Sequence, residues 1–156
     1  MKTSRQPRLA LIVAGALTAG LLAPSLPAQT PAEQAVLAPI QATFDGMAKR
    51  DAALIKEQAL PGGTLVLMRN GVPTQMTLDA FADRVAKPGT THNVESIKDP
   101  LIRIDNDLAV VWAYFEYTID GKLDHCGTDL FTLVRKDGKW LIASISDTGR
   151  KDCAAK

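Results

Sequence analysis

The sequence has few of the residues that bind metals: its 156 residues include only two histidines and two cysteines. Neither Cys-x-x-Cys nor His-Glu-x-x-His spacing occurs, so no familiar metal-binding pattern is present. His125, Glu116 and Asp129 could be grouped as a facial triad, but their spacing gives it no support. A glycine-rich phosphate loop is also missing, which disfavours a nucleotide or dinucleotide. We therefore expect neither a metal nor a cofactor.

Charge of either sign is not concentrated in the chain, which has 18 Lys and Arg against 17 Asp and Glu. Without a basic patch, nucleic-acid binding is disfavoured, and so is electrostatic attachment to an anionic membrane. The one long apolar run, residues 9–23, follows Lys2, Arg5 and Arg8. It is shorter than the roughly 20 residues that a membrane-spanning helix needs.

The N-terminal order of basic, apolar and small residues is typical of a secretory signal peptide. We expect residues 1–28 to be the signal, cleaved after Ala28 or alternatively after Ala32, and residues 29–156 to form a single domain. An uncleaved N-terminal anchor is the competing interpretation. Cleavage after Ala28 leaves 15 Lys and Arg against 17 Asp and Glu. The product would be a periplasmic or secreted protein without contact to the membrane.

The two cysteines, Cys126 and Cys153, are predicted to form a disulfide, because an exported pair is more often bridged than free. The strand register derived below places Cys126 opposite position 149, only four residues from Cys153. A redox-active or metal-binding pair is the alternative, and the spacing of the cysteines gives it no support.

Helices are predicted in the first half of the chain. Apolar residues at three- and four-residue spacing predict helix from Pro31 to about Leu60, with a break near Gly46 and a second start capped by Asp51. Thr77 is a suitable N-cap for a helix over residues 78–85. Short strands are expected at 64–68 and 72–76, and a longer one at 91–104 with an irregularity at Asp99-Pro100.

Residues 108–148 contain two Asp-Gly dipeptides, at 120–121 and 137–138, between runs of β-branched and aromatic residues. Asp-Gly favours a two-residue type I′ turn, so this segment predicts a three-strand antiparallel meander. If both turns have two residues, the numbers of directly opposed residues sum to 241 in the first hairpin and to 275 in the second, and opposed residues share a face of the sheet. One face then combines apolar with convergent polar side chains, as a ligand pocket requires. Its members include Trp112, Tyr114, Glu116, His125, Asp129, Phe131, Ser146 and Thr148. A slip of one residue would move a strand's side chains to the other face.

This register suggests a candidate catalytic set. Glu116 would face His125 and orient its imidazole as a general base. Tyr114 could donate a hydrogen bond to a developing oxyanion, and the pKa of Asp129 would rise if burial desolvated it. The competing interpretation is structural, with Glu116 and His125 as a cross-strand pair that only stabilises the sheet rim. We expect Trp112, Tyr114, Phe131, Ser146 and Thr148 to contact a ligand.

The order of helices followed by a long antiparallel sheet indicates the α+β class, with the helices on one side of the sheet. Several segments resemble the NTF2-like superfamily, including its SnoaL-like and DUF4440-like domains, and especially exported bacterial lumazine-binding-like proteins. These segments are residues 108–114, 120–122, 125–127, 137–140 and 147–150, with Phe131 and Cys153. The resemblance implies a cone-shaped barrel with N-terminal helices packed on a curved, mostly antiparallel sheet.

The resemblance also implies a homodimer through the outer sheet face. The predicted outer face is apolar and would need such a cover. Its members are Ala109, Val111, Phe115, Leu130, Val134 and Ile145.

Three functions remain open from the sequence. The first is an exported domain that binds a small, mostly apolar molecule in its cone-shaped pocket. The second is a cofactor-independent isomerase, dehydratase or cyclase that uses His125 with Glu116, Asp129 and Tyr114. The third is a dimeric accessory protein whose cone is filled by its own side chains, such as Trp112, Phe131 and Trp140.

Overall fold

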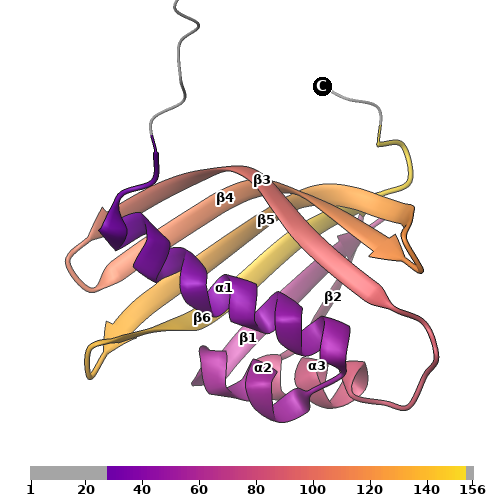
Figure 1. Ribbon diagram of the computed structural model, residues 1–156, viewed down its shortest axis with the longest axis horizontal. Coiled ribbons are helices and arrows are strands. Elements are labelled where there is room, and N and C mark those ends of the chain that lie inside the picture. The colour runs from indigo at the N-terminus through magenta and orange to yellow at the C-terminus, as the bar shows by residue number, and fades with distance from the viewer. Residues whose placement is uncertain (1–27, 154–156) are drawn as a thin grey trace, which may run out of the picture.

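The structure of the protein, a computed structural model, describes residues 28–153 (Figure 1). All but the last residue of the predicted signal peptide therefore lies outside the described residues. The elements are α1 (Pro31–Lys49), α2 (Ala52–Gln58), β1 (Ala59–Arg69), β2 (Val72–Thr77), α3 (Leu78–Val85), β3 (Asn93–Asp105), β4 (Leu108–Ile119), β5 (Lys122–Lys136) and β6 (Lys139–Arg150). This order of helices and strands confirms the predicted α+β class.

The helices begin where the sequence provides capping side chains. The Thr30 hydroxyl accepts a hydrogen bond from the Glu33 N–H, and the Glu33 carboxylate accepts one from the Thr30 N–H, which is a capping box. Asp51 and Thr77 cap α2 and α3 as predicted. The break between α1 and α2 falls at Arg50, whose φ of 56° ends the first helix.

The six strands form one sheet in the order β2-β1-β6-β5-β4-β3. All neighbouring pairs are antiparallel except β1 and β6, which are parallel. After β2 the chain passes through α3 to β3 at the opposite edge of the sheet, and the β3–β6 meander then returns until β6 lies beside β1. In Figure 1, α1 lies across one face of the curved sheet, and α2 and α3 lie at its lower end. We call the helix-covered face the inner face and the opposite one the outer face.

Both predicted Asp-Gly turns are confirmed. The central residues of each have positive φ, 50° and 76° at Asp120-Gly121 and 51° and 79° at Asp137-Gly138. Ile119 pairs with Lys122 and Lys136 pairs with Lys139, so both hairpins start in the predicted register.

The predicted register is wrong further along the strands, because bulges interrupt them. Asp124 is an extra residue in β5, so that Thr118 pairs with Leu123 but Tyr117 pairs with His125. Ala143 is an extra residue in β6, and a third irregularity lies at the predicted position in β3, at 99–100. Each extra residue reverses the alternation of side chains along its strand.

The bulges exchange the faces of β4 and of the second half of β6. Residues of β4 with odd numbers, including Val111 and Phe115, face inward and are buried, whereas Trp112 faces outward and is 54% exposed. The predicted outer-face set is therefore wrong in four of its members, since Ala109, Val111, Phe115 and Ile145 are buried beneath the helices or around the cavity. Leu130 and Val134 lie on the outer face as predicted.

The hydrophobic core lies between α1 and the inner face. Val36, Ile40 and Phe44 on one side of α1 pack toward Phe131 and Leu133 of β5. The rings of Phe44 and Phe131 meet edge to face with centroids 6.1 Å apart. Both rings also border the space beneath the helices.

The predicted disulfide between Cys126 and Cys153 is present, with a Cα–Cα distance of 5.7 Å. It joins the buried outer side of β5 to the segment after β6. Within residues 28–153, no helix is both long and apolar enough to cross a membrane.

Candidate functional site

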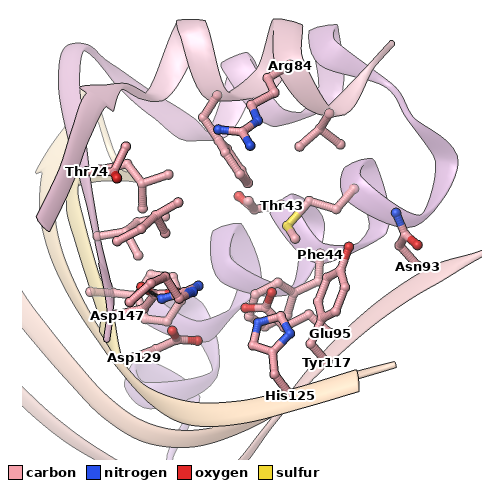
Figure 2. A pocket seen from close by; sticks show the side chains of 18 of the residues that line it. Thr43, Phe44, Thr74, Arg84, Asn93, Glu95, Tyr117, His125, Asp129 and Asp147 are labelled. Atoms are coloured by element: carbon pink, nitrogen blue, oxygen red, sulfur yellow. Dashed lines mark hydrogen bonds and ion pairs between the residues drawn. The ribbon is translucent and has the colours of Figure 1, made fainter. Parts of the chain in front are cut away.

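A cavity of about 480 Å³ opens between the inner face and the helices. Its apolar walls come from α1, β1, α3, β5 and β6, and include Phe44, Met47, Leu67, Phe81, Phe131 and Ile145. One group of polar side chains, from β1, β3, β5 and β6, lies at the sheet side of the cavity, and a second polar group lies at the helical side (Figure 2). The volume is within the range of small-molecule sites.

Glu95 and Asp129 form a buried carboxyl pair at the sheet side of the cavity. Asp129 is only 2% exposed, and the remaining exposed surface of Glu95 borders the cavity. Burial raises the pKa of Glu95 to about 7, opposed by its hydrogen bond with Asp129 and reinforced by the negative charge of Asp147. Burial, followed by the charges of Glu95 and Asp147, raises the pKa of Asp129 well above its ordinary value. Near neutral pH the two carboxyl groups therefore share a proton.

Arg69 and Asp147 form the charge pair beside these acids. Two guanidinium nitrogens of Arg69 donate to the two carboxylate oxygens of Asp147, each at 2.6 Å. The glycine at 149 makes this possible, because a Cβ there would lie 2.5 Å from the Arg69 side chain. Hydrogen bonding to Asp147 raises the pKa of Arg69, so the guanidinium remains charged.

His125 lies at the edge of the cavity, next to Tyr117 rather than Glu116. The two rings are tilted at 34° with centroids 4.8 Å apart, and Phe115 meets the imidazole edge to face. The Nδ1 atom is 2.8 Å from an Asp124 carboxylate oxygen, and Lys151 donates to the other oxygen of that carboxylate. Asp124, the bulge residue, thus holds the imidazole in the way predicted for Glu116.

The predicted site residues are divided between the two faces. His125, Asp129 and Phe131 line the cavity. The other five lie on the outer face, because β4 and the second half of β6 are turned over by the bulges; they are Trp112, Tyr114, Glu116, Ser146 and Thr148. The structure therefore does not bring the predicted catalytic set together.

The outer-face residues have structural partners instead. Glu116 forms an ion pair with Lys98 at 2.7 Å. The Arg150 guanidinium lies over the Tyr114 ring, with its Cζ atom 5.9 Å from the ring centroid. The Thr148 hydroxyl accepts a hydrogen bond from the Thr128 N–H. None of these contacts faces the cavity.

Polar residues at the helical side of the cavity differ in how they are bonded. Arg50 donates to the carbonyls of Val85, Lys87 and Thr91 and so fastens the segment after α3. Arg84 also borders the cavity, and Figure 2 shows its guanidinium directed into the open space. Within residues 28–153, no hydrogen bond or ion pair engages its side chain.

The sequence placed Glu95 on the predicted pocket face but did not name it as a site residue, and it missed Asp147, Arg69, Tyr117 and Arg84 as cavity residues. The irregularity predicted at 99–100 was a signal for Glu95, because an extra residue there changes the face on which the earlier part of β3 lies. No local pattern marks Asp124 or Ala143 as extra residues. Without those two positions, Tyr117 and Asp147 are assigned to the wrong face.

In the part of the chain that the structure describes, no group of three or more His, Cys, Asp or Glu side chains is arranged to hold a metal ion. The acids of the cavity are instead balanced by Arg69 and by a shared proton.

Solved structures with the same architecture include proteins described as NTF2-like and as having a cystatin-like fold. An NTF2-like protein of unknown function from Silicibacter pomeroyi is 19% identical, with a TM-score of 0.61 over 78% of this chain and 100% of that one. An NTF2-like protein from Cytophaga hutchinsonii is 17% identical, with a TM-score of 0.64 over 75% and 97%. A protein of unknown function with a cystatin-like fold from Nostoc punctiforme is 11% identical, with a TM-score of 0.64 over 80% and 96%. The protein thus has the NTF2-like α+β fold, as the sequence predicted.

The family is shown by the sequence itself. Residues 31–146 match the family model described as "Putative lumazine-binding", and the chain belongs to that family. A search of curated proteins finds no match to the sequence. The fold and the family therefore establish the class of protein. A proposal for its function has to be argued from the residues of the cavity.

Proposed function

We propose that the protein binds a small, mostly apolar molecule in the cavity between the inner face and the helices. The observation that carries this proposal is Asp129, a nearly fully buried carboxyl group that borders an apolar cavity. No N–H or hydroxyl group of the described residues donates to its Oδ2 atom. A buried polar atom without a partner costs about 1–3 kcal/mol, which a ligand donor would recover. The family description, with its reference to lumazine, is consistent with a small ligand.

The experiment uses 2-naphthol, a flat apolar bicycle with one hydroxyl donor, and measures its binding by titration calorimetry. Leu67→Trp places a large ring in the cavity wall and should abolish binding. Leu101→Trp makes the same kind of change on the outer face, where Leu101 is 50% exposed, and should leave binding unchanged. Binding that survives Leu67→Trp would contradict the proposal. Lumazine is the second probe, and native mass spectrometry of protein from its own host would identify a copurified ligand.

Acid–base catalysis is the second candidate, as a cofactor-independent isomerase, dehydratase or cyclase. It is favoured by the carboxyl pair, because the pKa of Glu95 is raised to about 7, where a group can both give and take a proton. Glu95, Asp129 and His125 replace the set predicted from sequence. The probe is α-tetralone in deuterated water, with NMR detection of exchange next to the carbonyl. Asp129→Asn should abolish any catalysed exchange, and Glu116→Gln on the outer face should not change it.

The accessory-protein alternative required a cone filled by Trp112, Phe131 and Trp140. Trp112 lies outside, and Trp140 packs beneath the Arg135 guanidinium, 5.3 Å from its ring centre. Only Phe131 borders the cavity. We therefore prefer ligand binding to a purely structural role.

We also propose a homodimer through the outer face. Leu101 and Trp112 are opposed on neighbouring strands and both are at least half exposed, with Leu108 close by on β4. Apolar side chains gathered in this way favour association. Analytical ultracentrifugation should show a dimer that Trp112→Glu converts to a monomer. A monomeric native protein would refute this proposal.

Export is proposed from the N-terminal sequence, with the Cys126–Cys153 disulfide as support, because such bonds persist in oxidising compartments. Mass spectrometry of the protein from the periplasm or medium should give a chain that begins at Gln29. A chain in the cytosol that retains residues 1–28 would contradict export.

A further inference from the structure

The sheet side of the cavity accepts hydrogen bonds and repels anions. Glu95, Asp129 and Asp147 all border it, and only Asp147 is neutralised by a neighbouring cation, Arg69. The hydrogen bond between the two acids raises the pKa of Asp129 and lowers that of Glu95, so Asp129 donates to Glu95 in it, and the Oδ2 atom of Asp129 is left without a donor. A ligand that reaches this side must offer an O–H or N–H group and must carry no negative charge there.

The helical side of the cavity has the opposite character. Arg84 belongs to the same stretch of α3 as Phe81 and Val85, and all three side chains border the cavity. The acid beside it in sequence, Asp83, is already bonded to Lys56 at 2.6 Å. Unlike Arg69 and Arg50, Arg84 has no carboxylate or carbonyl partner among residues 28–153. Its guanidinium is available to an anionic group.

The two ends face each other across apolar walls. In Figure 2, Arg84 points into the cavity from one side, while Asp129 and Asp147 lie on the other. Phe44, Phe81 and Phe131 belong to the walls between them. A ligand with a donor at one end and an anion at the other would be held in one orientation, since the reverse would place its anion against the acids.

We propose that the cavity binds an amphipathic organic anion, with an apolar ring body, an O–H or N–H donor directed to Asp129 and a carboxylate or similar anion directed to Arg84. This proposal rests on the proposed ligand-binding function and names the chemical class of the ligand. The orphaned oxygen of Asp129 and the unpaired guanidinium of Arg84 carry it together.

The test uses 6-hydroxy-2-naphthoate, which has a hydroxyl and a carboxylate at opposite ends of a flat bicycle, with calorimetry at pH 7. The matched probes are 2-naphthol, which lacks the carboxylate, and 2-naphthoate, which lacks the hydroxyl. We expect each deletion to weaken binding about fivefold to tenfold, as loss of one charge-assisted hydrogen bond at a partly solvated site would. Because both deletions are made in the ligand, this comparison does not depend on whether a variant folds.

Arg84→Gln should weaken 6-hydroxy-2-naphthoate about fivefold to tenfold and leave 2-naphthol unchanged. Arg84→Lys should retain part of the preference. Arg103→Gln, the matched control, removes the same charge from the outer face and should change neither affinity.

Equal affinity for 6-hydroxy-2-naphthoate and either truncated probe would overturn the proposal, and so would an unchanged preference in Arg84→Gln. If 2-naphthol still binds and Leu67→Trp still blocks it, the proposed function stands while this inference fails. If no probe binds, or if binding is insensitive to Leu67→Trp, the proposed function fails and this inference fails with it.

Discussion

The inner and outer faces of β4 have the same secondary structure but different roles. On the inner face the strand presents small or fully buried residues, among them Ala109, Val111 and Ala113, and these leave room for α1. On the outer face it presents Trp112, which remains 54% exposed despite being the largest apolar residue of the strand. Side-chain hydrophobicity therefore does not show which face of this strand is covered.

The difference between the faces is set by extra residues rather than by composition. Both faces of the meander are rich in apolar residues. The sequence pattern therefore looks much the same whether or not an extra residue exchanges the two faces of a strand. The bulges at Asp124 and Ala143 determine that Glu116 and Ser146 lie outside and that Tyr117 and Asp147 lie beside the cavity. Bulges also bend a sheet, and a curved sheet is what leaves space beneath α1.

The largest expected effect comes from matched truncations on the two faces. Phe131→Ala removes a ring that is 1% exposed and packs against Phe44, and should lower the free energy of unfolding by about 3–5 kcal/mol. Trp112→Ala should cost less than about 1 kcal/mol in a monomer, because the ring is largely solvated. Urea unfolding measures both. A large cost for Trp112→Ala that depends on protein concentration would show that the outer face is covered in solution.

The disulfide gives the next effect, because it anchors the chain after β6 to the outer side of β5. The bridge spans 27 residues, and its loss should cost about 3 kcal/mol through the greater freedom of the unfolded chain. Cys126→Ser/Cys153→Ser and reduced wild type should both unfold at lower urea concentration. Because neither cysteine borders the cavity, 2-naphthol should still bind under conditions where the double variant is folded.

A pH effect should distinguish the inner acids from the outer ones. The pKa of Glu95 is raised to about 7 in the folded protein, so between about pH 4.5 and 7 the folded chain binds more protons than the unfolded chain. The stability of the wild type should therefore fall as the pH rises through this window, and the fall that remains above pH 7 belongs to Asp129, whose pKa is raised well above its ordinary value. Glu95→Gln removes this titration and relieves the like-charge repulsion on Asp129, whose pKa is also raised.

Urea unfolding at pH 5 and pH 8 gives the difference in free energy of unfolding between Glu95→Gln and wild type. We expect this difference to shift in favour of the variant by on the order of 1–3 kcal/mol from pH 5 to pH 8. Glu116→Gln on the outer face is the matched control and should leave the slope of stability against pH unchanged. Parallel slopes for wild type and Glu95→Gln would show that the carboxyl pair does not titrate in this window.

The smallest effect should follow from breaking the outer ion pair. The ammonium of Lys98 is half exposed and lies 2.7 Å from Glu116, and such pairs contribute little. Lys98→Ala should barely change the free energy of unfolding and should become indistinguishable from wild type in 1 M salt. A larger, salt-resistant loss would indicate that this part of the outer face is shielded from solvent.

The sequence determined the local structure: capping by Asp51 and Thr77, tight turns at the Asp-Gly pairs, the α+β class and the Cys126–Cys153 bond. Each of these depends on the chemistry of one or a few residues, which is written in the chain itself. The family resemblance was also readable, since it rests on short segments of the meander.

Only the tertiary structure decided which side chains meet in the cavity. Glu95, Asp129, Asp147 and Arg69 come from four strands, and their convergence depends on sheet order, curvature and single extra residues. The position of a bulge depends on packing on both faces of the sheet along the whole strand. The type of a turn depends on the two residues within it. For this reason the hairpin ends were predictable from the sequence, and the faces of the strands beyond them were not.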